Sequence, residues 1–399
     1  MRIGFNASLF ASREIRGWTR YGLNLINALD REGHDITLFT PYAINQELFS
    51  RLSPGVKTVH TATTRYWRWL SFDLPKALKR ERIELFHTPH HFGLPPNAPC
   101  PTVVTIHDAI EMQDRKMRFS DLRQPKTLPN KLDHWLTEKV AHQVITVSQY
   151  SHDRIVEQRP HLRGRVAVIP NAADPLFSPS FSPLPPEIKA QLDAAPYFFY
   201  VGGFEQRKNV PFLLKAFAES NLSTTRLVMA GGLGNNRAAL SAQIQALNLE
   251  SRCTLLGRVD DSWLPGLYAG AQAFVYPSLY EGFGLQICEA FAMGCPVLAS
   301  DATSLPEVLG TGGKTFTLDS TQQLSALLTK ISNDAAYRDE LKQRAVKRSA
   351  TFSWDETARL TARVYSKILS RPKVGRLVPS LRQTPPSSPN APVQPSAVP

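Results

Sequence analysis

The stretch AFVYPSLYEGFGLQICEAFAMGCPVLA, residues 273–299, decides the fold assignment. It begins with an apolar run that ends near Pro277, as a strand covered on both faces does. A loop carrying Glu281 and Gly284 follows, and apolar residues at helical spacing then continue to Gly294, a glycine placed where a helix ends. A second apolar run comes next. Strand, loop, helix and strand in this order indicate a parallel α/β unit.

The same alternation extends outward through most of the 399 residues. Short β-rich runs predict strands at 2–6, 35–39, 83–87, 102–106, 143–147 and 166–169, and again at 197–201, 226–230, 253–257, 273–276 and 296–299. Some of these runs, such as residues 197–201, are continuously apolar, as strands covered on both faces are. A helix is predicted after Asn209, with Pro211 in its first turn. Strands and helices that alternate in this way predict parallel sheets flanked by helices.

Prolines divide the chain into two α/β parts of similar size. They crowd residues 174–186, which we interpret as a linker because proline fixes φ and removes a backbone donor. The expected domains are residues 1–173 on one side and a second domain from residue 187 on the other. Beyond residue 370 the composition changes to Pro, Ser, Gln and Arg, so residues 371–399 are expected to form a disordered tail.

Composition limits the classes of function. The net charge is +12, and four of these positive charges lie in the tail. The excess suits phosphate, anionic lipid or nucleic acid, but the basic residues form no recognised nucleic-acid module, so no nucleic-acid partner is expected. No apolar stretch reaches about 18 residues, and no leader pattern precedes the first strand. A cytoplasmic location is therefore expected. The four cysteines form no C-x-x-C pair and suggest neither a zinc site nor a disulfide framework.

Two loops place chemical groups at the predicted carboxyl ends of strands, where open α/β sheets bind ligands. One carries Glu281, with Glu289 about one turn inside the following helix. The other reads Gly202-Gly203-Phe204-Glu205-Gln206-Arg207-Lys208 and combines glycines with a cationic pair. Glycines before a helix let backbone N–H groups approach an anion. Each loop taken alone also fits an ordinary solvated turn. Their coincidence favours a ligand site.

An ordered set of motifs resembles the retaining glycosyltransferase family 4. The set comprises Thr105-Ile106-His107-Asp108, Thr146-Val147-Ser148, Val168-Ile169-Pro170-Asn171, Arg207-Lys208-Asn209, Tyr268-Ala269-Gly270-Ala271, Pro277-Ser278, the Glu281-x7-Glu289 pair and Ser304-Leu305-Pro306-Glu307. The resemblance covers about residues 1–370. It implies the GT-B fold, with two facing Rossmann-like domains, acceptor-side residues 1–173 and donor-binding residues 187–352. A helix within 353–370 would cross back onto the first domain.

The resemblance also implies roles for single residues. Glu281 would contact hydroxyls of the transferred sugar, Glu289 would hold the ribose, and His107 would face the sugar from the opposite domain, with Asp108 as a candidate to orient it. The departing diphosphate would meet further donor-site residues, namely Gly17, Gly202, Gly203, Arg207, Lys208 and the backbone N–H groups of Phe283, Gly284 and Leu285. Fixed cations and helix-end dipoles can stabilise a leaving group as a divalent metal does. No metal or other cofactor is expected, and the chain has no Asp-x-Asp pair.

Some positions leave alternatives open. His107, at the end of an apolar strand, also fits a hydrogen-bonded core residue. Thr19 stands where family members commonly have a second glycine, Gln286 where proline is frequent, and Gly203 where some relatives carry arginine. The Thr-Ile-His-Asp and Arg-Lys-Asn segments are most similar to bacterial polysaccharide mannosyltransferases, so GDP-mannose is the expected donor. The expected acceptor is a glycan or a lipid-linked glycan.

Other functions remain open. A phosphorylase, a nucleotide-sugar hydrolase or epimerase, or a non-catalytic nucleotide-sugar-binding protein would fit the same scaffold. A dehydrogenase is disfavoured because the segment at 232–237 puts Arg237 where a dinucleotide motif needs its third glycine. Residues 65–70 and the basic residues up to Arg82 suggest a helix that lies on anionic lipid at the inner face of the plasma membrane. Inward aromatics with a solvated basic face fit them equally well.

Overall fold

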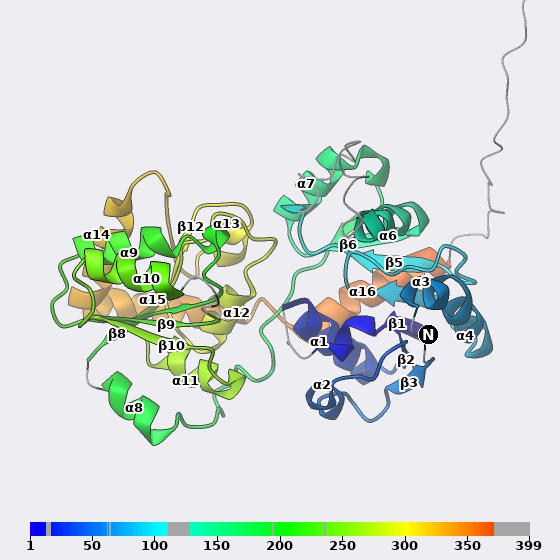
Figure 1. Ribbon diagram of the computed structural model, residues 1–399, viewed down its shortest axis with the longest axis horizontal. Helices are drawn as coiled ribbons and strands as arrows, with labels where there is room; N and C mark the ends of the chain where they lie inside the picture. Colours follow the sequence, from blue (N-terminus) through cyan, green and yellow to red (C-terminus); the bar gives the residue numbers. More distant parts are fainter. Residues whose placement is uncertain are drawn as a thin grey trace, which may run out of the picture.

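The chain forms two halves that lie side by side, and each half is a sheet of parallel strands flanked by helices (Figure 1). The structure is a computed structural model, and it describes residues 1–12, 17–61, 63, 65–110, 128–193, 195–232, 234 and 237–370. Within these residues there is one seven-stranded and one six-stranded sheet, and every strand pair in both is parallel. The predicted α/β class with two Rossmann-like units is confirmed.

The first sheet has the order β3-β2-β1-β4-β5-β6-β7, in which the chain reverses direction beside β1, as in doubly wound folds. Its strands are β1 (Arg2–Asn6), β2 (Asp35–Thr40), β3 (Lys57–His60), β4 (Leu85–Thr88), β5 (Thr102–Thr105), β6 (Gln143–Thr146) and β7 (Val166–Val168). Its helices are α1 (Gly17–Arg31), α2 (Gln46–Ser50), α3 (Tyr66–Arg68), α4 (Leu74–Arg80), α6 (Leu128–Val140) and α7 (Gln149–Gln158), with the short turns η1 (Ser8–Ala11), η2 (Trp69–Asp73) and η4 (Pro160–Leu162).

The second sheet repeats this plan with the order β10-β9-β8-β11-β12-β13. Its strands are β8 (Tyr197–Val201), β9 (Arg226–Ala230), β10 (Cys253–Gly257), β11 (Ala273–Tyr276), β12 (Val297–Ser300) and β13 (Lys314–Phe316). Its helices are α8 (Pro186–Asp193), α9 (Val210–Glu219), α10 (Arg237–Ala246), α11 (Leu264–Ala269), α12 (Leu285–Ala292), α13 (Leu305–Leu309), α14 (Thr321–Asn333) and α15 (Ala335–Ser349), with the turns η5 (Gln206–Lys208) and η7 (Asp261–Trp263).

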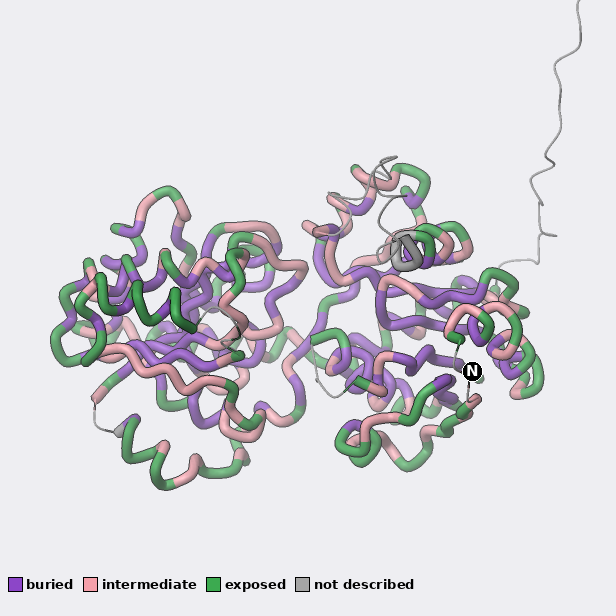
Figure 2. Tube along the Cα trace, viewed as in Figure 1, coloured by how far each residue is buried: buried purple, intermediate pink, exposed green. Residues whose placement is uncertain are grey.

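Apolar runs form the strands because both faces of each sheet are covered. The central strands β4, β5, β11 and β12 are buried along their whole length, and Figure 2 shows the buried chain concentrated in the two sheets. Helix α9 turns Val210, Leu213, Leu214 and Phe217 inward, with Pro211 in its first turn, as predicted. No helix among the described residues is long and apolar enough to cross a lipid bilayer.

The last helix, α16 (Trp354–Leu369), returns from the second half and packs against α1 of the first (Figure 1). Trp354 Nε1 donates to the Ala173 carbonyl at 2.8 Å, and Tyr365 OH lies 2.5 Å from His87 Nδ1 inside the first core. The predicted crossing helix is therefore present. It joins the two halves a second time, besides the chain segment at 174–185, which contains no helix or strand.

Two strands were missed by sequence reasoning. β3 is an edge strand whose residues are mostly exposed, and β13 has only three residues, so neither presents the continuous apolar run that identifies the others. The expected tail at 371–399 and part of the dinucleotide-like segment at 232–237 lie outside the described residues.

Candidate active site between the two halves

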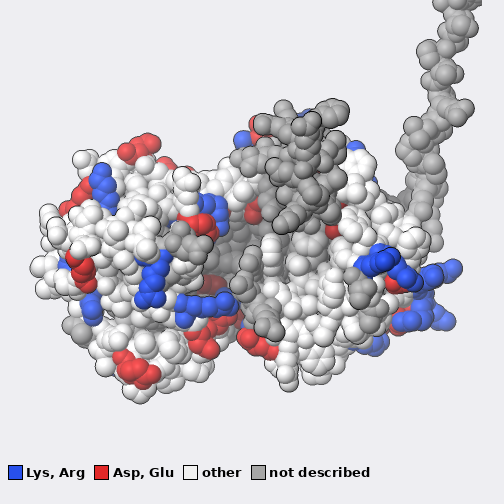
Figure 3. Space-filling model, in the orientation of Figure 1, with Lys and Arg blue, Asp and Glu red and all other residues white. Residues whose placement is uncertain are grey.

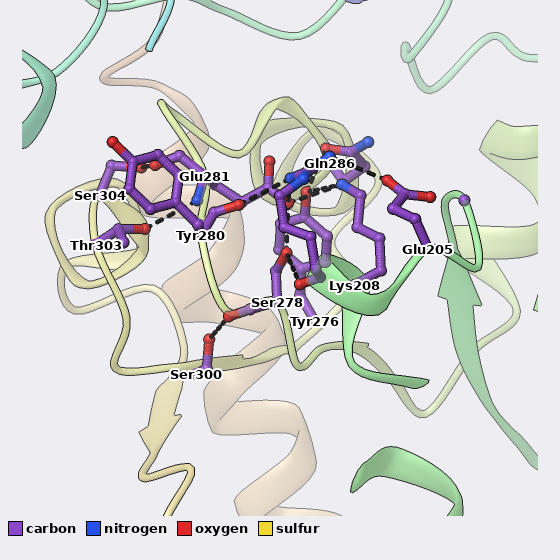
Figure 4. Close-up of polar contacts among 12 residues, drawn as sticks. Glu205, Lys208, Tyr276, Ser278, Tyr280, Glu281, Gln286, Ser300, Thr303 and Ser304 are labelled. Atoms are coloured by element: carbon purple, nitrogen blue, oxygen red, sulfur yellow. Dashed lines mark hydrogen bonds and ion pairs between the residues drawn. The ribbon is translucent and has the colours of Figure 1, made fainter. Parts of the chain in front are cut away.

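Glu281 is the centre of a compact ionic cluster in the loop after β11 (Figure 4). Three side chains donate to the same carboxylate oxygen, Glu281 Oε1: Lys208 Nζ at 2.7 Å, Arg207 Nη1 at 2.7 Å and Ser278 Oγ at 2.5 Å. No described residue donates to Oε2, the second carboxylate oxygen. One oxygen is thus held by the protein, and the other remains able to accept hydrogen bonds from a ligand.

Local structure brings these residues together. Arg207 and Lys208 lie in the short turn η5, which follows β8. The Arg207 carbonyl accepts a hydrogen bond from Leu279 N at 2.8 Å and lies 3.2 Å from Ser278 Oγ. These contacts tie η5 to the loop after β11. Lys208 is buried, and its Nζ also donates to Tyr276 OH at 3.0 Å. Arg207 Nη2 also pairs with Glu205 Oε1 at 3.1 Å, so two loops from neighbouring strands form one ionic cluster of two cations and two carboxylates.

The charge of Glu281 follows from its partners. Burial acts to raise its pKa, but the positive charges of Lys208 and Arg207, with hydrogen bonds from Lys208 and Ser278, outweigh that effect and hold the pKa below its ordinary value. Glu281 is therefore a carboxylate at neutral pH. An ionised, largely buried carboxylate with one oxygen available is a strong acceptor for sugar hydroxyl groups.

The predicted glycines lie around this cluster. Gly284 precedes α12 with φ +95°, a conformation that favours glycine. Ile287 N donates back to the Gly284 carbonyl at 2.9 Å, whereas the N–H groups of Leu285 and Gln286, which start the helix, have no carbonyl one turn earlier in the helix. Gly17, at the start of α1, approaches α12 so closely that a Cβ there would lie 3.5 Å from Leu285 Cδ1. Gly202 and Gly203 lie between β8 and η5, and Phe283 is buried beside Gly284.

Glu289 lies farther along α12 and forms a separate cluster. Its Oε2 accepts from Tyr268 OH at 3.1 Å, and its Oε1 lies 3.3 Å from Nη1 of Arg20, which belongs to α1 of the other half. Arg20 Nη2 also lies 2.5 Å from Asp261 Oδ2. Burial raises the Glu289 pKa, an effect that Arg20 and Tyr268 partly offset. The counter-charge of Glu289 thus comes from the opposite half of the molecule, whereas that of Glu281 comes from its own half.

His107 reaches the site from the loop after β5. Its Nε2 donates to the Pro89 carbonyl at 2.9 Å, and its ring meets the Tyr21 ring edge-on with centroids 4.7 Å apart. The suggested partner Asp108 instead accepts from Ile110 N at 3.0 Å, so the Pro89 carbonyl orients His107. Burial lowers the His107 pKa to about 4, so its ring is neutral at pH 7 and the nitrogen Nδ1 is an acceptor.

The two halves touch directly at this site. A Cβ on Gly282 would lie 2.1 Å from the His107 carbonyl oxygen, so only glycine fits there. Ser148 Oγ donates to the Gly282 carbonyl at 2.6 Å, and the Glu307 carboxylate accepts from Gln149 N, at the start of α7, at 2.8 Å. Beside these contacts is a cavity of about 670 Å³ lined by residues of both halves, including His107, Arg207 and Glu281. Figure 3 shows a hollow between the halves.

Sequence reasoning missed the residues that hold the predicted ones. Ser278, Tyr276 and Tyr268 position Lys208 and the two glutamates, and Arg20 is the distant counter-charge of Glu289. Ser278 and Tyr268 occur within the quoted motifs, which was the available signal. For Arg20, three residues after Gly17, the sequence gives no indication of its partner 269 residues away.

Two family models match almost the whole described chain. Residues 15–176 match the model described as Glycosyltransferase Family 4, and residues 186–348 match the model described as Glycosyl transferases group 1. The chain belongs to the family 4 glycosyltransferases. In this glycosyltransferase the two matched regions correspond to the two sheets, and the cluster around Glu281 lies within the second region.

Curated relatives agree with this membership, and a solved structure agrees with the fold. The Escherichia coli O-antigen chain mannosyltransferase B is 34% identical over 228 residues, which are 56% of this chain and 60% of that protein. The E. coli serotype-specific mannosyltransferase WbdA is 29% identical over 68% of this chain and 34% of its own length. Among solved structures, Anabaena HepE in complex with UDP-glucose matches with a TM-score of 0.71 at 20% identity, covering 92% of this chain and all of that one.

Proposed function

We propose that this chain transfers a hexose from a nucleotide diphosphate sugar to a glycan or lipid-linked glycan acceptor in bacterial cell-surface polysaccharide synthesis. The observation that carries the proposal is the contact of Lys208 and Arg207 with Glu281 on the wall of a cavity between the two halves. Family membership and the names of the O-antigen relatives support the reaction class.

The reaction breaks the bond between the sugar anomeric carbon and the diphosphate oxygen and forms a bond to an acceptor hydroxyl, whose proton leaves. Positive charge develops on the sugar and negative charge on the nucleoside diphosphate. Arg207, Lys208 and the start of α12 supply fixed positive charge for the leaving group, so the proposed mechanism is metal-independent. Glu281 Oε2 and His107 Nδ1 accept sugar hydroxyls, and Glu289 accepts those of the ribose. Transfer with retention of the anomeric configuration is part of the proposal.

The proposed donor is GDP-mannose. The relatives named mannosyltransferases support mannose, whereas the structural neighbour HepE was solved with UDP-glucose. A thermal-shift screen of GDP-, UDP-, ADP- and dTDP-sugars tests this choice, because a ligand at 100 times its dissociation constant stabilises the folded protein by about 2.7 kcal/mol. If another nucleotide sugar stabilises the protein and GDP-mannose does not, that nucleotide sugar takes the place of GDP-mannose as the proposed donor.

Two substitutions test the site itself. Lys208→Ala and Glu281→Ala are each expected to lower turnover about 100-fold or more, because each removes a charge that acts on the transition state. Lys215→Ala, which changes an exposed lysine of α9 in the same half, is the matched control and should retain normal turnover. The measurement is release of nucleoside diphosphate with saturating donor and acceptor. Near-normal turnover in both site variants would disprove the assignment.

We also propose that the protein is cytoplasmic and that its first half makes peripheral contact with the membrane. Along the helical stretch 66–80, Arg68, Phe72, Lys76 and Lys79 are exposed at helical spacing, whereas Trp69 is buried, and the Phe72 side chain is 61% exposed. Lys and Arg atoms cover this edge, over α4, in Figure 3. Such a face suits an anionic lipid surface. Co-sedimentation with anionic vesicles, weakened by salt and by Phe72→Ala, is expected; equal binding to neutral vesicles would contradict it.

A further inference from the structure

Thr303, in the turn between β12 and α13, has a backbone conformation that is rare for its residue type. Its φ is +56°, in the left-handed region, where the Cβ of a non-glycine residue lies close to the following carbonyl oxygen. In the described part of the chain, the other non-glycine residues with positive φ are one arginine and three asparagines, and asparagine tolerates this region better than a β-branched residue does. Such a conformation costs free energy and persists where surrounding contacts impose it.

The side chains of this turn bind the backbone of Glu281. Thr303 Oγ1 accepts from Glu281 N at 3.0 Å, and Ser304 Oγ, which is buried, donates to the Glu281 carbonyl at 2.9 Å. Figure 4 shows Thr303 and Ser304 beside Glu281. Both main-chain polar groups of Glu281 are therefore held by side chains that come 22 and 23 residues later in the chain.

The loop that carries Glu281 depends on contacts of this kind. Residues 277–284 form no helix or strand, so their backbone groups lack the partners that a regular element supplies. At the start of the loop, Ser300 Oγ donates to the Ser278 carbonyl at 2.6 Å, and Leu279 N donates to the Arg207 carbonyl at 2.8 Å. Hydrogen bonds from neighbouring segments, several of them from side-chain hydroxyls, thus set the path of the loop.

The position of the Glu281 backbone determines where its carboxylate lies. Glu281 Oε1 lies 2.7 Å from both Lys208 Nζ and Arg207 Nη1, and it keeps these two contacts only while the Glu281 Cα stays in place. Without the Thr303 hydroxyl, the Glu281 N–H would lose its partner, and the peptide would turn toward another acceptor. A shift of about 1 Å at a catalytic group can lower turnover about 100-fold.

We propose that Thr303 is a positioning residue for the transfer reaction, because its hydroxyl fixes the backbone of Glu281 and thereby the carboxylate that faces the transferred sugar. The inference rests on the proposed function, since it takes Glu281 to act on that sugar. If the hydroxyl only stabilised the turn, its loss would change the stability of the protein and leave turnover unchanged. The two roles therefore differ in a variant that loses the hydroxyl without losing stability.

Thr303→Gly in the full-length chain is that variant, because glycine adopts positive φ readily and the substitution relieves the strained conformation. Its melting temperature should stay within about 2 °C of wild type. Its kcat should fall about 10- to 100-fold, with a change below about threefold in the KM for GDP-mannose. Thr303→Ser keeps the hydroxyl and should retain most of the turnover. Asn248→Gly, which changes an exposed residue with φ +55° after α10, is the matched control and should leave kcat unchanged.

Crystal structures of the wild-type protein and the two Thr303 variants separate this inference from the proposed function, because they need no turnover. In Thr303→Gly the Glu281 carboxylate should leave Lys208 and Arg207, whereas in Thr303→Ser it should keep both contacts. An unchanged kcat in Thr303→Gly, a Glu281 carboxylate that keeps both cations there, or an equal loss of turnover in Thr303→Ser would each overturn the inference. If Glu281 moves as expected but the wild-type protein transfers no sugar from any nucleotide donor, the positioning of Glu281 by Thr303 stands and the proposed reaction fails.

Discussion

Arg20→Met removes the cation that Glu289 receives from the other half of the molecule. The Arg20 side chain is 14% exposed and that of Glu289 is 7% exposed, so their contact at 3.3 Å is shielded from water. After the substitution, the charged groups near Glu289 are the carboxylates of Asp261 and Asp174, and Tyr268 OH remains as its hydrogen-bond donor. A buried carboxylate without a counter-charge takes up a proton more readily.

The size and pH dependence of the effect follow from this geometry. Removing one partner of a buried ion pair costs about 3–5 kcal/mol, and we expect about 2–3 kcal/mol here because the contact is long and Arg20 is partly hydrated. Burial already holds the Glu289 pKa above its ordinary value, so the folded chain keeps this proton to higher pH than the unfolded chain. Because of this difference, the free energy of unfolding falls as pH rises from the ordinary glutamate pKa to the pKa of Glu289 in the folded chain. Arg20→Met raises the pKa of Glu289 in the folded chain further, so the loss of stability that the substitution causes grows with pH.

Thermal unfolding at pH 5 and pH 8 measures this prediction. The melting temperature of Arg20→Met should fall below wild type by about 3–4 °C at pH 8 and by clearly less at pH 5. In the proposed function Glu289 holds the ribose of GDP, so affinity for GDP, measured by calorimetry, should fall about 10- to 100-fold in Arg20→Met and recover partly as pH rises, because ionised carboxylates bind hydroxyl groups more strongly.

A matched control lies on the same helix. Arg31 pairs with Asp355 of α16 at 2.6 Å, but both side chains are more than half exposed, so Arg31→Met should cost about 1 kcal/mol or less. Equal effects of Arg20→Met and Arg31→Met, or a cost of Arg20→Met that does not change with pH, would refute the reasoning.

Three further predictions concern contacts around the site. Tyr276→Phe removes the hydroxyl that accepts from Lys208 Nζ at 3.0 Å and should lower turnover about 10-fold in steady-state assays without a large change in melting temperature. Gly282→Ala places a Cβ 2.1 Å from the His107 carbonyl oxygen and should force the halves apart, which small-angle scattering detects as a larger radius of gyration together with a loss of turnover. Glu307→Gln weakens the carboxylate contact with the start of α7 and should lower the free energy of unfolding at pH 7 by about 1 kcal/mol, measured in urea.

Much of the fold was predictable because strands that are buried on both faces of a sheet consist mostly of apolar residues. Strands such as β8 and β11 consist of continuous apolar or aromatic residues, and Pro211 and Gly294 mark a helix start and a helix end. The edge strands β3 and β13 have no such apolar run, because few of their residues are buried. They are strands because their backbone groups form hydrogen bonds with the neighbouring strand of the sheet. The order of strands could be inferred only through the family resemblance.

The candidate site was predictable by residue type but not by contact. Arg207, Lys208 and Glu281 were expected at one edge, and they lie in direct contact. Sequence spacing could not show that all three donors share a single oxygen of Glu281, nor that the Pro89 carbonyl, rather than Asp108, orients His107. Such choices depend on side-chain packing between loops that are far apart in the chain.

The two glutamates of the Glu-x7-Glu pair show why the site belongs to both halves. Glu281 takes its counter-charges from its own half, and its pKa lies below the ordinary value. Glu289, eight residues later on the same segment, takes its cation from α1 of the other half, and its pKa lies above the ordinary value. A ligand that needs both carboxylates ionised binds best when the halves are in contact, because separation removes Arg20 from Glu289. Binding of the proposed nucleotide should therefore favour the joined arrangement.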